Sequence, residues 1–175
     1  MAVQWEYARL RLANGWGDDF GILEQRESEL PGRVVSAVAR TPPQWLGALL
    51  RLGPVEPAFL RRLLLRSGDD PSGLVSVWLR PAMAEGTGLE APELLNESLR
   101  QHLSDRKSAQ FGRAAERIAA RRPTAGEAGL LGISADAPVL GVTVVIYDRA
   151  RDPWQVVELA LPGDRHELRD AYDFT

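Results

Sequence analysis

The sequence predicts an α+β domain: a mostly antiparallel sheet from a duplicated helix–β-hairpin unit, flanked by helices. An internal repeat is the first observation, because Pro57 and Pro81 recur as Pro138 and Pro162, in each case 81 residues further on. The second is that each copy contains two apolar runs separated by a turn with proline, which is typical of a β-hairpin. Two copies favour one duplicated domain, since solenoids need about three or more.

Each copy begins with a short helical segment and continues with a strand, a turn and a returning strand. In the first copy these elements are predicted at 49–52, 59–65, 69–71 and 74–79. In the second copy they are predicted at 130–133, 139–147, 151–153 and 154–161. Two such hairpins would pair into one sheet with the helices against it.

The remaining elements surround these two units. Strands are predicted at 5–12 and 20–24, as an N-terminal β-hairpin extension over residues 1–30, and at 33–39 in the main domain of residues 31–175. Pro92 opens a predicted helix whose apolar stripe is Leu94, Leu95, Leu99 and Leu103. The segment 111–122 stays open between helix, from its Ala, Glu and Arg content, and strand, from its position before the second unit.

Composition excludes several classes of function. The 175 residues include no cysteine, which rules out disulfides, thiol nucleophiles and thiolate metal sites. No apolar run approaches the roughly 20 residues of a membrane span, and no signal peptide is visible, so we expect a cytoplasmic protein. Arginine supplies all but one of the 21 basic residues, yet the net charge is −3. A GC-rich genome explains that bias better than direct nucleic-acid binding, which requires a net basic footprint.

An ordered series in the second half carries a family resemblance. It comprises Leu131-Gly132, Pro138-Val139-Leu140, Pro153 and Gly163-Asp164-Arg165, followed by His166 where an aromatic residue is usual. This series resembles the UTRA domain, the effector-binding half of GntR/HutC-type bacterial transcription regulators. The resemblance implies a chorismate-lyase-like fold, a homodimer and a small-molecule effector. It also implies a winged helix-turn-helix, for which residues 1–30 leave no room, so we expect a free-standing or excised effector domain.

The resemblance also places the effector site. Family members that bind sugar phosphates or small acids use an Arg-x-Arg pair, two glutamates and a tyrosine. Counted from the turn prolines, those positions hold Leu63, Leu65, Val75, Gln155 and Leu161. Asn96 and Ser98, on the helix that follows the first unit, complete the expected ligand-binding set. Because leucine and valine cannot pair with an anion, the pocket is expected to hold an apolar molecule or to be filled by its own side chains.

The expected function is therefore a non-catalytic ligand-sensing or interaction module of a bacterial transcription regulator, without its own DNA-binding domain. It would act through a separate DNA-binding protein or an absent segment. The alternatives are a chorismate-lyase-like enzyme acting on a small aromatic acid, and a purely structural dimerisation domain. No catalytic residue, cofactor or metal site is expected. His102 is predicted on a polar helix flank, and Glu158 on the sheet face opposite the pocket, as an exposed or inter-subunit charge.

Overall fold

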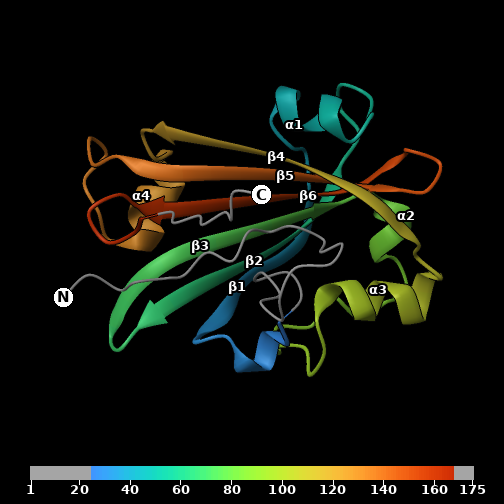
Figure 1. Ribbon diagram of the computed structural model, residues 1–175, viewed down its shortest axis with the longest axis horizontal. Coiled ribbons are helices and arrows are strands. Elements are labelled where there is room, and N and C mark those ends of the chain that lie inside the picture. The colour runs from blue at the N-terminus through green and yellow to red at the C-terminus, as the bar shows by residue number, and fades with distance from the viewer. Residues whose placement is uncertain (1–24, 168–175) are drawn as a thin grey trace, which may run out of the picture.

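Six antiparallel strands form one sheet in the order β1-β2-β3-β6-β5-β4 (Figure 1). The structure, a computed structural model, describes residues 25–167. The strands are β1 Gly32–Arg40, β2 Ala58–Ser67, β3 Asp70–Leu79, β4 Phe111–Arg121, β5 Val139–Asp148 and β6 Pro153–Pro162. The predicted α+β class is confirmed. The strands predicted at 5–12 and 20–24 lie outside the described residues, and the domain boundary at residue 30 stays a prediction.

The helices are short. They are the 3-10 helix η1 Glu27–Glu29 and the α-helices α1 Gln44–Leu49, α2 Pro81–Ala84, α3 Leu99–Lys107 and α4 Ala125–Leu131. Across residues 25–167 the structure contains no helix with the length and apolar character needed to cross a membrane.

The duplication is visible in the strand pairing. The β2–β3 hairpin follows α1 and the β5–β6 hairpin follows α4, and β3 pairs with β6 at the centre of the sheet. The segment 111–122, for which the sequence left helix and strand as alternatives, forms β4. This strand pairs with β5 as β1 pairs with β2. Ladder hydrogen bonds to β5 decide this outcome, since tertiary pairing overrides the weak helix preference of Ala, Glu and Arg.

The helix predicted to open at Pro92 begins later. Ser98 caps α3, and its Oγ accepts a hydrogen bond from the Gln101 amide at 3.2 Å. The backbone before the cap bonds to η1 instead: the Ser28 amide donates to Leu95 O and the Glu27 amide to Glu97 O. These contacts with a distant segment hold residues 91–97 out of a helix.

The central strands β2, β3, β6 and β5 are largely buried on both faces of the sheet, whereas the edge strands β1 and β4 are mostly half-buried or exposed. On the face that we call the α3 face, Leu63, Val75 and Val157 pack with Leu99 and Leu103 of α3. The other face, the α1/α4 face, carries two smaller apolar clusters, one under each helix. Its α1 cluster comprises Leu46, Leu50, Ala58, Leu60, Trp78, Val145 and Val156, and its α4 cluster comprises Leu64, Leu74, Leu131 and Ala160. Figure 1 shows α1 and α4 towards opposite ends of the strands.

Two glycines give opposite expectations for substitution by alanine. A Cβ on Gly112 would lie 2.6 Å from the carbonyl oxygen of Asp148, next to a register shift between β4 and β5. A Cβ on Gly129, in α4, would meet nothing within 4 Å. We expect Gly112→Ala to lower the free energy of unfolding by about 1–3 kcal/mol through overpacking. Gly129→Ala should raise it by about 0.5–1 kcal/mol through helix propensity.

Urea denaturation of the two variants and the wild type checks this pair. A Gly112→Ala protein as stable as the wild type would show that β4 and β5 do not approach each other as described.

Candidate functional site

The α3 face gathers most of the residues predicted to bind the effector. Leu63, Leu65, Val75 and Leu161 belong to one apolar cluster, and each is no more than 3% exposed. Gln155 lies on the same face, where it pairs across the ladder with Leu79 and Ile146, and it is also buried.

The two remaining predicted residues lie at the N-terminal end of α3. The hydroxyl of Ser98 is the cap of that helix, so it is already bonded to the Gln101 amide. Asn96 is exposed, on the segment that leads to the cap. The assignment of all seven residues to ligand binding stays a prediction.

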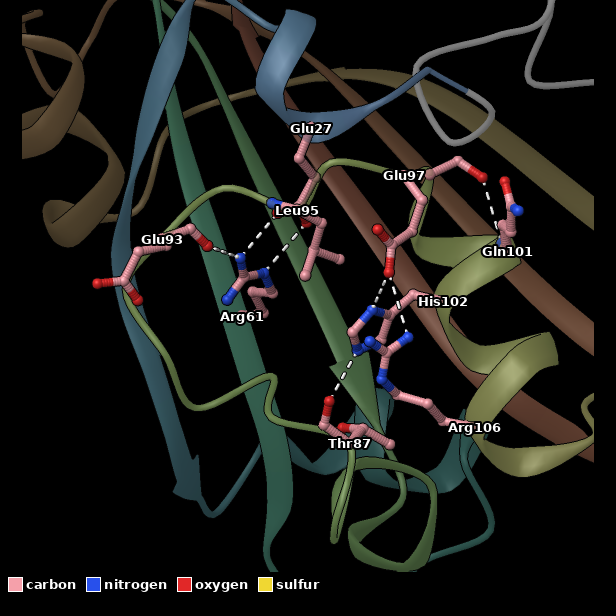
Figure 2. Close-up of polar contacts among 10 residues, drawn as sticks. Glu27, Arg61, Thr87, Glu93, Leu95, Glu97, Gln101, His102 and Arg106 are labelled. Atoms are coloured by element: carbon pink, nitrogen blue, oxygen red, sulfur yellow. Dashed lines mark hydrogen bonds and ion pairs between the residues drawn. The ribbon is translucent and has the colours of Figure 1, made fainter.

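Arg61 is a residue of this face that the sequence analysis did not identify. It is fully buried, and its Nε and Nη2 donate to the two carboxylate oxygens of Glu27 at 3.1 and 2.7 Å. Its remaining N–H groups donate to the carbonyl oxygens of Leu89, Ala91 and Glu93 at 2.7–2.9 Å, and Figure 2 shows the contact with Glu93. Arg61 therefore holds η1 and the connection between α2 and α3 against the sheet. Strand parity could have revealed it, because Arg61 shares a face with Leu63.

The bonding of Arg61 limits the chemistry of the α3 face. A guanidinium group has five N–H donors, and all five are used by Glu27 and the three carbonyls. An anion could reach Arg61 only by displacing one of these partners. The neighbouring Leu63, Leu65 and Val75 offer no donor at all, and an unpaired buried ion costs several kcal/mol (about 3–5 when one partner is removed).

His102 lies inside the protein, so its predicted place on a polar helix flank is wrong. Its Nδ1 is 2.7 Å from Glu97 Oε1 and its Nε2 is 2.9 Å from the carbonyl oxygen of Thr87 (Figure 2). Both partners accept when Glu97 is ionised, so an imidazolium ring can donate to both at once. Arg106 Nη1 also donates to Glu97 Oε1, at 3.1 Å. This cluster ties α3 to the end of the α2 turn.

Within residues 25–167, no three His, Asp or Glu side chains come together as a metal-binding group.

The buried pair of Arg61 with Glu27 should dominate the stability of this region. Removing one partner of a buried ion pair costs about 3–5 kcal/mol, because the other charge stays buried. We expect that loss in the free energy of unfolding for Glu27→Gln. The matched control is Glu29→Gln, which breaks an exposed pair with Arg26 at 3.6 Å and should cost less than about 1 kcal/mol.

Guanidinium denaturation measures both variants. Equal stability of Glu27→Gln and Glu29→Gln would contradict the buried placement of Arg61.

The Glu97 cluster predicts a pH dependence. The hydrogen bond from His102 lowers the pKa of Glu97 below its ordinary value of 4.5. A carboxyl whose pKa falls on folding stabilises the protein above the unfolded-state pKa, and this contribution disappears as the pH falls through the folded-state pKa. We expect Glu97→Gln to be less stable than the wild type at neutral pH, with a difference that shrinks below pH 4.5.

Unfolding curves across that pH range check this expectation, with the exposed Glu85→Gln as the control. A difference that stays constant with pH would contradict a role for the ionised carboxylate.

Comparisons with known proteins agree with this geometry. Residues 25–167 match the UTRA domain family. The effector domain of PhnF from Mycobacterium smegmatis is 24% identical, with a TM-score of 0.65 over 82% of this chain and 87% of that one. The C-terminal domain of the histidine utilization repressor from Pseudomonas syringae pv. tomato is 19% identical, with a TM-score of 0.68 over 82% and 99%.

A GntR-family transcriptional regulator from Bacillus cereus, 13% identical, has a TM-score of 0.71 over 83% of this chain and 99% of its own. No sequence among the curated proteins matches the chain. The solved structures share the fold, and the family match covers most of the sequence and all of the sheet. The chain therefore belongs to the UTRA domain family.

Proposed function

We propose that this UTRA domain is a non-catalytic regulatory module of a bacterial transcription regulator, whose effector site does not take a charged ligand. The single observation that carries the proposal is the apolar cluster of Leu63, Leu65 and Val75. These residues are buried at the positions where family members that bind charged effectors have arginine and glutamate side chains. The match to the family and the likeness to effector domains support the regulatory role.

Two forms of this site are compatible with that cluster. The α3 face takes an apolar small molecule, or its own side chains fill it and the domain acts by binding another protein. In both forms we propose a cytoplasmic homodimer that reaches DNA through a separate DNA-binding protein or through a DNA-binding segment that is absent from this sequence.

The variant Leu63→Ala separates the two forms. If the site is filled, the substitution creates a cavity, lowers the free energy of unfolding by about 2–5 kcal/mol and allows benzene to bind, as in other engineered apolar cavities. If the site is open to an apolar effector, the wild type already binds benzene. The control is Val55→Ala, whose side chain is 85% exposed and which should change neither property. Benzene binding is measured by calorimetry.

Native mass spectrometry of the freshly purified protein tests the proposal itself. A dimer that carries an apolar adduct, or none, agrees with it. Saturable binding of glucose 6-phosphate that Leu63→Ala weakens would overturn it. Turnover of chorismate would favour the chorismate-lyase-like enzyme instead, which requires a free arginine and carboxylate on the α3 face. Arg61 and Glu27 lie on that face but bind each other.

A further inference from the structure

A row of polar side chains crosses the whole sheet on the α1/α4 face, with one residue from each strand. In spatial order from β1 to β4 the row is Ser36, Arg62, Ser76, Glu158, Thr143 and Arg117. Each member is the direct cross-strand partner of the next, so their side chains emerge on the same face.

This polar row separates the two apolar clusters of that face. Two residues from the row in one direction along β3 and β6 are Trp78 and Val156, which belong to the α1 cluster. Two residues from the row in the other direction are Leu74 and Ala160, which belong to the α4 cluster. The row therefore occupies the strip between the two helices that Figure 1 shows towards opposite ends of the sheet. Apolar side chains would cover this strip at lower cost, because desolvating a charge is expensive.

The charged groups of the polar row are only partly satisfied. Arg62 Nε donates to Ser76 Oγ at 2.8 Å, and Trp78 Nε1 donates to Glu158 Oε2 at 2.9 Å. In the described part of the chain these are the only side-chain hydrogen bonds of Arg62 and Glu158, and no ion pair joins the two. Within the described residues, no hydrogen bond or ion pair uses the two Nη groups of Arg62 or Oε1 of Glu158.

Both side chains are half-buried, and this partial burial disfavours the charged form of each. Burial raises the pKa of Glu158, and burial lowers the pKa of Arg62. The neighbouring charges at the α4 end are already paired, since Arg121 binds both oxygens of Glu127 at 2.7 Å. Arg62 and Glu158 are thus the desolvated charges of the row that a ligand would complete.

We propose that the polar row is a binding site for a small carboxylic acid that carries an α-hydroxyl or α-amino group. The ligand carboxylate pairs with the two Nη groups of Arg62 in the bidentate geometry that guanidinium favours. Its hydroxyl or amino group donates to Glu158 Oε1. Arg62 and Glu158 lie two strands apart, about 10 Å between Cα atoms. In this proposal the ligand bridges the space between their side chains.

The chemistry of the row also selects against a multiply charged anion. Glu158 lies two strands from Arg62, on the far side of Ser76, and the Glu127 carboxylate lies close enough to raise the pKa of Glu158 further. Phosphate would meet these negative charges and leave Oε1 without a donor, whereas a hydroxy or amino acid satisfies both ends. The polar row lies on the face opposite to the α3 face, so this inference does not depend on the function proposed for that face.

The indole N–H of Trp78 reports directly on Glu158. We would record ¹⁵N–¹H spectra of the full chain with L-lactate, L-alanine and inorganic phosphate as probes, and assign the indole signal with Trp78→Phe. The expected result is a saturable shift of that signal with lactate or alanine and none with phosphate. Arg62→Gln and Glu158→Gln should weaken binding about tenfold or more, because each removes a charge-assisted hydrogen bond.

The matched control is Arg122→Gln, which removes an exposed arginine whose partner is Asp136 and should leave the affinity unchanged. Thr143→Val is a second, milder substitution in the row. Dispersed amide signals show whether each variant is folded. Absence of any shift with lactate and alanine, an equal affinity in the folded Arg62→Gln protein, or tighter binding of phosphate would each overturn the proposal.

Discussion

The antiparallel pairing of β3 with β6 is the interaction on which the rest of the structure depends. It runs from Leu74 opposite Ala160 to Leu79 opposite Gln155, and it joins two hairpins that the chain builds separately. Because both strands are central, both faces of the sheet must be covered. The register of this one pair also decides which side chains share a face, and thus brings residues of the two halves of the duplication together.

The two faces of the sheet are covered differently, by one large apolar cluster on the α3 face and by two smaller clusters on the α1/α4 face. On β2, β3 and β6 the α3 face is apolar except at Arg61 and Gln155, and it is closed by a connection from which three carbonyl groups, those of Leu89, Ala91 and Glu93, bind Arg61. The guanidinium group therefore serves the fold: it satisfies backbone groups that would otherwise be buried without partners. On the α1/α4 face, two short helices cover two separate clusters and leave the polar row between them.

This division bears on how a UTRA domain can diverge. At the positions where the family resemblance predicts effector binding, leucine and valine form part of the core and offer no donor to an anion. Under the function proposed above, such a domain would receive its signal as an apolar molecule or at another surface. In the polar row, the half-buried Arg62 and Glu158 each make one side-chain hydrogen bond with the described residues.

The sequence by itself determined the α+β class, the duplicated hairpins and the family, because apolar runs, turn prolines and their spacing are local signals. It also determined that Leu63 and Leu65 share a face, since strand parity is a property of the chain, whereas the β2–β3 register places Val75 opposite Leu63. Only the tertiary structure decided that 111–121 is a strand and that residues 91–97 are not helical, because both depend on hydrogen bonds to distant segments. The same holds for the buried Arg61 and His102 and the half-buried Glu158: their hydrogen-bond partners Glu27, Thr87 and Trp78 lie far away in the sequence, and no local pattern brings them together.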